Sequence, residues 1–279
     1  MTTTKPPVFT DADFSNKRTW GPTPRYPKVK AVKPVKRKEP FIIAGPCFAE
    51  SEAIVAKTAQ FLARRGVRYM RGGVYRAGTY PPANGEFGLF LGALKDFSYH
   101  AHKNGLKIVI EVLDYRLMDI IAQFADVLQV GARHMQDYAL LKEVAQFNGP
   151  VTIKRGVGQT IDELLGACEY LTEGRCAPMI IERGSSTFLN HVRWDLSISA
   201  IPAIKAITGI PVLVDASHGT GRRDLVEPMT LAGIAAGADG FLCETHPTPT
   251  ASLSDADQAV DFKTFSRIQD KAKKIWRVR

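Results

Sequence analysis

The chain has 279 residues, of which 45% are hydrophobic and 23% charged, and its formal net charge is +9 at pH 7. This length suits one large α/β domain, and no apolar run approaches the ~20 residues of a membrane-spanning helix. The N-terminus lacks the apolar segment of a signal peptide, and the four cysteines form no CxxC pattern. We therefore expect a cytoplasmic protein with reduced thiols and no membrane partner.

Residues 1–40 carry most of the positive charge. They hold 10 Lys or Arg, 3 Asp or Glu and seven prolines, which gives this segment a charge of +7 and leaves +2 for the remainder. This composition predicts an extended, basic, Pro-rich N-terminal arm, followed by a catalytic domain over residues 41–279. Because the excess charge belongs to the arm, it does not indicate a nucleic-acid-binding face on the folded domain.

After the arm, short apolar segments alternate with amphipathic ones, which is typical of βα units around a parallel sheet. The predicted strands are residues 41–45, 69–74, 107–112, 127–130, 151–154, 179–182, 211–214 and 240–243. The predicted helices are residues 51–65, 89–103, 115–124, 138–147, 161–171, 198–207, 225–236 and 262–275. Eight consecutive units favour a (β/α)8 TIM barrel, with an open doubly wound sheet as the alternative.

Polar side chains follow nearly every predicted strand. They are Cys47, Arg71, Arg76, Glu111, Asp114, Arg133, Lys154, Arg155, Glu182, Arg183, Asp215, His218, Glu244 and His246. A (β/α)8 barrel builds its active site at the C-terminal ends of its strands, so these side chains are expected to meet at the barrel mouth.

One subset, together with an aspartate further along the chain, could hold a metal. Cys47, His218, Glu244 and Asp255 offer sulfur, nitrogen and oxygen ligands, a mixture that suits a divalent transition metal. Their wide separation in sequence leaves an alternative open, in which Cys47 packs as a small hydrophobe and His218 is a hydrogen-bonded structural residue.

A second subset is cationic, and it consists of Arg71, Arg133, Lys154 and Arg183. Four cations at one mouth would repel one another unless an anion neutralised them, and arginine binds phosphate and carboxylate in a bidentate manner. The alternative is that some of them pair with Glu111, Glu182 or Asp215. The chain has neither a GxxxxGK nor a GxGxxG motif, so no nucleotide site is expected.

Eight sequence blocks carry a resemblance to a known family. They are IAGPCFAES (43–51), MRGGVY (70–75), EVLD (111–114), GARHMQDYALL (131–141), IKRG (153–156), IERG (181–184), DASHGTGRRDLVEP (215–228) and ETHPTPTASLSDADQ (244–258). In this order they resemble the short 3-deoxy-D-arabino-heptulosonate 7-phosphate (DAHP) synthases, which share their fold with 3-deoxy-D-manno-octulosonate 8-phosphate synthases. The resemblance implies a transferase of the shikimate pathway of aromatic amino acid biosynthesis. Such an enzyme condenses phosphoenolpyruvate with erythrose 4-phosphate.

The resemblance also implies roles for individual residues. One divalent ion (Mn, Fe, Co or Zn) would be bound by Cys47, His218, Glu244 and Asp255, and Cys47, His218 and Lys154 would be the catalytic residues. The expected substrate-binding residues are Arg71, Arg76, Glu111, Arg133, Lys154, Glu182 and Arg183. A homo-oligomer, either a dimer or a tetramer, is expected as well.

The chain departs from the family pattern at two positions. Gly78 and Ser186 stand where the family usually has arginines, the first of which is expected to bind the aldose phosphate. An alternative function is therefore a paralogue that joins phosphoenolpyruvate to a different aldehyde. A third alternative, a barrel that only binds partners through its basic arm, gives no reason to retain the metal ligands and the cations together.

Overall fold

The computed structural model of the protein describes residues 38–74, 90–174 and 176–279. Nearly all of the predicted arm lies outside these residues, as do Arg76 and Gly78. The division at residue 40 between arm and catalytic domain thus stays a prediction.

Eight parallel strands form a closed barrel in which each strand pairs with the next and β8 pairs with β1. The strands are β1 (Phe41–Gly45), β2 (Tyr69–Arg71), β3 (Lys107–Val112), β4 (Val127–Val130), β5 (Pro150–Lys154), β6 (Ala177–Glu182), β7 (Val212–Asp215) and β8 (Gly240–Glu244). The register is closed across β1, where Ile43 lies opposite Tyr69 on one side and Leu242 on the other. The predicted (β/α)8 barrel is confirmed, and the open-sheet alternative is wrong.

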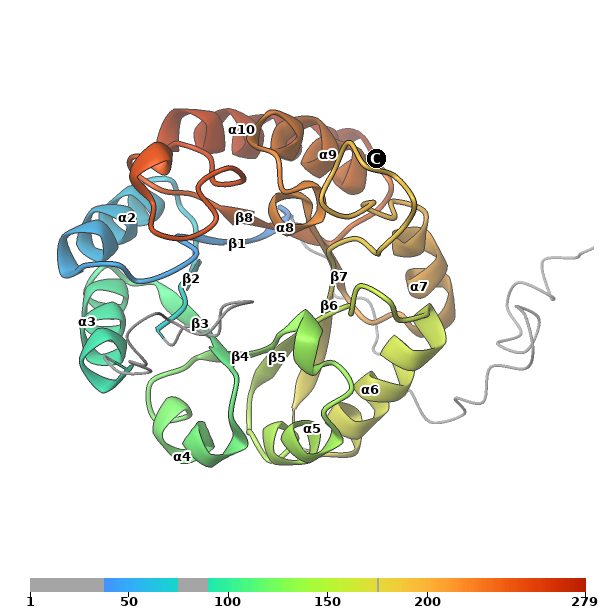
Figure 1. Ribbon diagram of the computed structural model, residues 1–279. Helices are drawn as coiled ribbons and strands as arrows, with labels where there is room; N and C mark the ends of the chain where they lie inside the picture. Colours follow the sequence, from blue (N-terminus) through green and yellow to red (C-terminus); the bar gives the residue numbers. More distant parts are fainter. Residues whose placement is uncertain (1–37, 75–89, 175) are drawn as a thin grey trace, which may run out of the picture.

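Helices surround the barrel as an outer layer (Figure 1). They are α2 (Glu52–Arg64), α3 (Phe90–Lys103), α4 (Met118–Ile121), α5 (Tyr138–Val144), α6 (Ile161–Glu173), α7 (Ala200–Thr208), α9 (Arg223–Ala235) and α10 (Phe262–Val278). Local sequence fixes several of their starts: Thr160 and Glu163 form a reciprocal capping box at α6, and Asp261 caps α10. A short additional helix, α8 (Ala216–Thr220), was not predicted.

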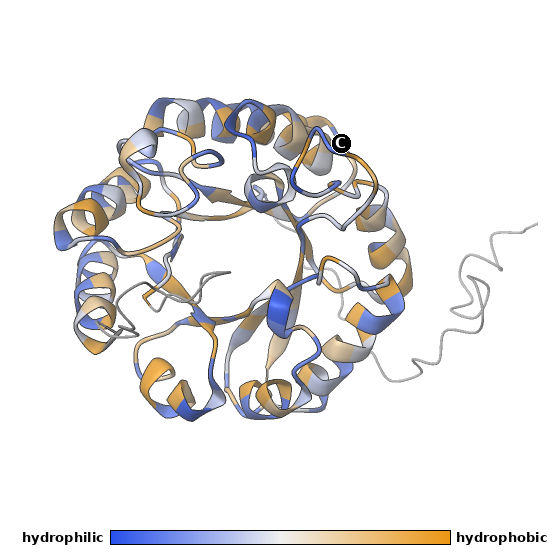
Figure 2. Ribbon diagram, in the orientation of Figure 1, coloured by the Kyte–Doolittle hydropathy of each residue, from blue (hydrophilic) through white to orange (hydrophobic). Residues whose placement is uncertain are grey.

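The strands alternate between two apolar layers. Phe41 and Ile43 belong to a cluster inside the barrel, while Ile42 and Ala44 belong to the larger cluster between the strands and the helices. Successive side chains of a strand point to opposite faces, so this alternation identifies the inward and outward rows. Figure 2 shows the corresponding pattern on the outer layer, where the helices carry both hydrophobic and hydrophilic residues.

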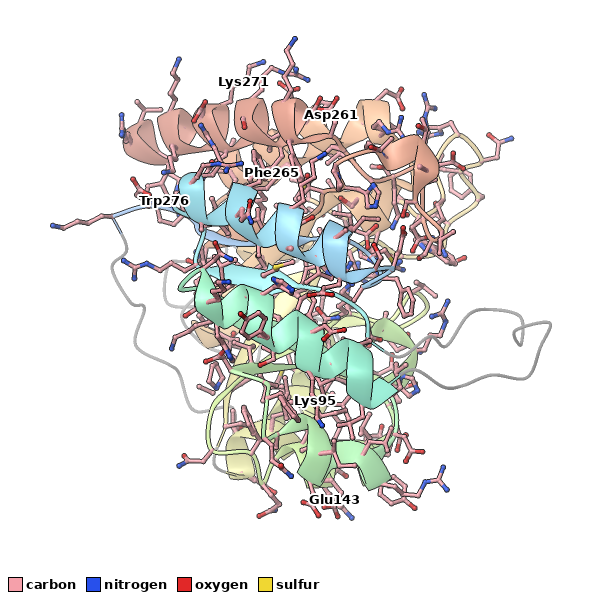
Figure 3. The ribbon with its side chains drawn as sticks, turned by 90° about the vertical axis from the view of Figure 1, so that its left-hand side faces the viewer. Lys95, Glu143, Asp261, Phe265, Lys271 and Trp276 are labelled. Atoms are coloured by element: carbon pink, nitrogen blue, oxygen red, sulfur yellow. The ribbon has the colours of Figure 1, made fainter. Side chains whose placement is uncertain are left out.

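Helix α10 closes the outer layer next to α2 and α9 (Figure 1). Phe265 lies on its inner side and Lys271 on its outer side (Figure 3). Phe265 is fully buried, and its ring lies edge-on to Phe61 of α2, with the ring centroids 5.9 Å apart. In the described part of the chain, no helix has the length and apolar character needed to cross a bilayer.

Candidate active site at the barrel mouth

The inward rows of the strands change from apolar to polar at the mouth. On five strands, the residue two positions after an inward-facing apolar side chain is charged. The inward apolar residues are Tyr69, Val109, Ile181, Leu213 and Leu242, and the charged residues that follow them are Arg71, Glu111, Arg183, Asp215 and Glu244. The period-two alternation of a strand turns all of these positions toward the barrel axis. The apolar floor thus supports a polar upper layer at the end where such barrels place their active sites.

Three of the predicted metal ligands form a cluster. The ligand atoms of Cys47, Glu244 and Asp255 all lie within 4.8 Å of one another. The Cys47 thiol donates a hydrogen bond to Asp255 Oδ2 at 3.0 Å and accepts one from Ser254 Oγ at 2.9 Å. Asp255 has φ +52°, the one non-glycine residue of the described segments in the left-handed region, which aims its carboxylate at Cys47 from the loop after β8.

His218, the fourth predicted ligand, lies beside this cluster on helix α8. Its Nε2 is 3.1 Å from Glu244 Oε1, and its Nδ1 is 2.7 Å from Asp215 Oδ2. One thiol, two carboxylates and an adjacent imidazole are a donor set that fits a divalent transition metal. Burial raises the pKa of the Cys47 thiol well above its usual value, and Glu244 raises it further; a coordinated cation acts in the opposite direction.

Glu244 connects the metal-ligand cluster to the cations. It accepts hydrogen bonds from Arg71 Nη1 at 2.7 Å and from Gln258 Nε2 at 2.6 Å. Burial opposes the ionisation of this carboxyl, but contacts with His218 and Arg71 outweigh it and lower the pKa of Glu244 strongly. This ligand is therefore ionised before any metal binds.

Lys154, at the end of β5, lies within reach of the same histidine. Its Nζ is 3.3 Å from Asp215 Oδ2 and 3.4 Å from each ring nitrogen of His218. Asp215 is fully buried, and although burial opposes its charge, His218 and Lys154 lower its pKa far below the usual value. The three side chains form one contiguous charged group at the barrel mouth, in which the ionised Asp215 contacts both Lys154 and His218.

Arg183 and Arg133 provide further positive charge. Arg183 is buried, and its guanidinium lies 5.4 Å from the ring centroid of Trp194. Arg133 is exposed and lies on the 3-10 helix Ala132–His134, which follows β4. Burial lowers the pKa of Arg183, and the charges of Arg193 and Arg133 lower it further. Within the described segments, the buried Nε atoms of Arg183 and Arg71 have no hydrogen-bond partner. Arg183, a buried cation with other cations nearby and one unbonded donor, is suited to binding an anion.

Glu182 occupies the opposite row of β6. Ile180, two positions earlier on the same strand, faces the helices. The Glu182 carboxylate accepts hydrogen bonds from Arg155 Nε at 2.7 Å and from Arg155 Nη2 at 2.9 Å. It also accepts the backbone N–H of Gly184 at 2.9 Å. These contacts favour a structural role over the predicted substrate contact.

Glu111 faces the barrel axis and is half-buried, and its Oε2 accepts a hydrogen bond from Gln129 Nε2 at 3.1 Å. A Cβ atom at Gly131 would lie 2.0 Å from Glu111 Oε1, so only glycine allows this placement. Arg76 was also predicted to bind substrate, and it lies outside the described residues.

Arg193 and Trp194 were not among the residues predicted for the site. They lie in the loop between β6 and α7, which folds back on itself through two hydrogen bonds of 3.0 Å between Ser185 and Asp195. Neither strand nor helix periodicity applies to this loop, so its return to the mouth could not be anticipated.

The fold and the mouth together define a barrel enzyme class in which a mixed sulfur and oxygen donor cluster adjoins a set of cations. Residues 30–277 match the DAHP synthetase I family, and the chain belongs to this family. Phospho-2-dehydro-3-deoxyheptonate aldolase of Thermotoga maritima is 40% identical over 235 residues, which cover 84% of this chain and 69% of that protein. 2-dehydro-3-deoxyphosphooctonate aldolase of Acidithiobacillus ferrooxidans is 30% identical over 241 residues, covering 78% and 83%.

Solved structures agree with this assignment. The crystal structure of the Thermotoga maritima DAHP synthase matches with a TM-score of 0.83 and 39% identity, covering 87% of this chain and 71% of that chain. A truncated form of the Thermotoga maritima enzyme matches with a TM-score of 0.79 and 37% identity, covering 87% and 88%. The similarity therefore extends over nearly the whole described barrel.

Proposed function

We propose that this enzyme condenses phosphoenolpyruvate with erythrose 4-phosphate to form DAHP and phosphate, as a DAHP synthase of aromatic amino acid biosynthesis. The observation that carries the proposal is the meeting of two groups at one barrel mouth. These are the donor cluster of Cys47, Glu244 and Asp255, and the cations around Lys154 and Arg183. Membership of the family and the similarity to the Thermotoga maritima aldolase support the same reaction.

In this reaction the C3 atom of phosphoenolpyruvate forms a bond to the aldehyde carbon. A water oxygen adds at C2, and phosphate leaves with cleavage of the bond between C2 and its oxygen. Arg133, Lys154 and Arg183 are proposed to bind the phosphate of phosphoenolpyruvate and to stabilise its charge as it leaves. Lys154, next to His218 and Asp215, is the side chain best placed to supply or accept a proton.

Cys47, His218, Glu244 and Asp255 are the residues that would hold the divalent metal. When bound, such an ion polarises a carbonyl oxygen or activates a water. The thiol among the donors favours Mn, Fe, Co or Zn over magnesium, which prefers oxygen ligands. Gln258 and Arg71 hold the Glu244 carboxylate from outside the donor set, and such supporting hydrogen bonds orient metal ligands.

A second candidate function rests on Ser186. This residue is exposed and uncharged, and its backbone N–H donates to Val157 O at 2.6 Å. Without a cation at this position, the acceptor could be an aldehyde that lacks a phosphate. To decide, the metal-loaded protein is incubated with phosphoenolpyruvate and a panel of aldoses and aldose phosphates, and phosphate release is followed with the product mass. Efficient formation of DAHP supports the first function, and a preference for another aldehyde supports the second.

We also propose a cytoplasmic homo-oligomer, a dimer or a tetramer. Phosphoenolpyruvate is an intermediate of central metabolism, which favours the cytoplasm. Tyr138 of α5 and Tyr170 of α6 are exposed, and their ring centroids lie 5.1 Å apart on neighbouring helices, as suits a protein contact. Light scattering coupled to size-exclusion chromatography measures the oligomeric state directly.

A further inference from the structure

Arg193 is a fifth cation of the mouth that belongs neither to the donor cluster nor to the predicted phosphoenolpyruvate contacts. Its backbone N–H donates to Thr220 O at 2.8 Å. A Cβ atom at Gly221 would lie 2.7 Å from its Cβ, so the start of the Arg193 side chain packs closely against α8 and the turn that ends it. The base of this side chain is thus fixed on the helix that carries His218.

The guanidinium of Arg193 extends to the rim of the donor cluster. Its Nη1 lies 3.4 Å from Asp255 Oδ1 and 3.4 Å from Gln258 Oε1. The ring of the next residue, Trp194, has its centroid 5.4 Å from the Arg183 guanidinium, and the charge of Arg193 is one of those that lower the pKa of Arg183. Arg193 therefore contacts the rim of the donor cluster, where a bound ion would polarise a carbonyl oxygen or activate a water, and its charge acts on the buried cation of the anion site.

Among the described residues, the contacts of Arg193 leave donor capacity unused. A guanidinium has five N–H donors, both contacts of Nη1 are long, and the side chain is 40% exposed. Arg222, on the same rim, differs in this respect. The Arg222 side chain is 47% exposed, but its Nε and Nη2 donate to the two carboxylate oxygens of Asp224 at 3.1 and 2.6 Å. Its Nη1 donates to His191 O. Of these two exposed arginines, Arg193 is the one oriented toward the donor cluster and available to an anion.

The loop that carries Arg193 also carries Ser186. Ser185 pairs with Asp195 in an isolated antiparallel bridge, and both Ser186 and Arg193 lie in the segment between these two residues. Ser186 is exposed and brings no charge, so the positive charge of this segment comes from Arg193.

We propose that Arg193 binds the phosphate of the acceptor aldehyde and so makes the enzyme select phosphorylated over unphosphorylated acceptors. This inference rests on the proposed condensation reaction and specifies the chemistry of its acceptor. Three observations carry it: Arg193 contacts the donor cluster, the next residue packs against the buried Arg183, and the Arg193 side chain is 40% exposed. A phosphate there gains a charge-assisted hydrogen bond from a guanidinium that has donors to spare.

The test compares two acceptors that differ only in the phosphate. Steady-state kinetics with phosphoenolpyruvate are measured on the metal-loaded wild type, Arg193→Ala and Arg193→Lys, with erythrose 4-phosphate and with erythrose. In Arg193→Ala, we expect the KM for erythrose 4-phosphate to rise about 10-fold to 100-fold. The KM for phosphoenolpyruvate and the kcat/KM for erythrose are expected to change less than about 2-fold, and Arg193→Lys recovers part of the loss. The matched control Arg222→Ala, which removes the same charge from the same rim, is expected to leave all of these values unchanged.

A binding measurement separates recognition from positioning. Erythritol 4-phosphate lacks the aldehyde and cannot react, so calorimetry with this compound measures the acceptor site alone. Arg193→Ala is expected to weaken it by the same factor as the KM, with the affinity for the metal unchanged. An equal loss with both acceptors, or a tenfold loss of metal affinity, shows that Arg193 only positions Asp255 and overturns the inference.

The wild type tests the proposed function itself. If it uses erythrose as well as erythrose 4-phosphate, the inference fails and the condensation reaction stands. If it turns over neither acceptor, the proposed function fails. Binding of erythritol 4-phosphate to the wild type and to Arg193→Ala then decides the role of Arg193.

Discussion

Replacement of Glu182 tests whether this residue binds substrate, as predicted from the sequence, or stabilises the barrel. The Glu182 side chain is fully buried and that of Arg155 is 7% exposed, and the two are joined by hydrogen bonds of 2.7 and 2.9 Å. Glu182→Ala leaves the Arg155 guanidinium buried without its carboxylate. Removing one partner of a buried pair costs roughly 3 to 5 kcal/mol.

For a domain of this size, 1 kcal/mol shifts the melting temperature by about 2 to 4 °C. The Glu182→Ala variant is therefore expected to melt roughly 6 to 20 °C below the wild type in differential scanning calorimetry. Its KM for phosphoenolpyruvate is expected to stay within about threefold of the wild type, because the carboxylate lies on the helix side of β6 and not on the inward row.

A double variant provides the control. In Glu182→Leu with Arg155→Leu, both charges are removed, and an apolar pair can replace a buried ion pair at little cost, so part of the lost melting temperature should return. The reasoning is refuted if Glu182→Ala melts within about 2 °C of the wild type while its KM for phosphoenolpyruvate rises tenfold or more. That result would restore Glu182 to the substrate site.

Three further predictions concern the metal, the donor substrate and the surface. Cys47→Ala should lose most of the bound metal in elemental analysis, and full activity after exhaustive chelation would exclude a metal role. Lys154→Ala and Arg183→Ala should each weaken phosphoenolpyruvate binding by roughly 2 to 5 kcal/mol in calorimetry, and unchanged affinity in both would place the donor site elsewhere. Hydrogen bonds from Arg267 lower the pKa of Glu227, so Glu227 stabilises the fold above its usual pKa and loses this effect as the pH falls through its lowered value. Glu227→Gln should thus cost under about 1 kcal/mol at pH 7, with the unfolding free energies of variant and wild type converging in acid.

The barrel could be predicted because its strands carry two independent signals. Strands such as β1 (Phe41–Gly45) and β5 (Pro150–Lys154) are short apolar runs that end at a glycine or a polar residue, and each is followed by an amphipathic helix. Helix α8 was missed because it has five residues, ASHGT, which contain a glycine and too little length for a helical period. Its formation depends on Asp215, whose side chain caps it by accepting the N–H of His218 at 3.0 Å.

The location of the site could be predicted from the sequence more easily than the residues that form it. The sequence places Glu182 and Arg183 next to each other at the end of a strand, and only the register shows that they point to opposite faces. Arg193 could not be found because a returning loop, and not a strand end, brings it to Asp255. Local patterns therefore identify the strand ends, whereas side-chain direction and loop return require the tertiary structure.

Glu244 explains why the two halves of the mouth depend on each other. Its carboxylate is fully buried and contacts the cation Arg71, the imidazole of His218 and the amide of Gln258. These partners keep it ionised, whereas burial keeps the neighbouring Cys47 thiol protonated in the protein without metal. A cation entering the cluster thus finds one carboxylate ready and must displace the proton of the thiol. Because Arg71 holds the same carboxylate on its other side, the state of the donor cluster is coupled to a cation of the anion site by a single shared side chain.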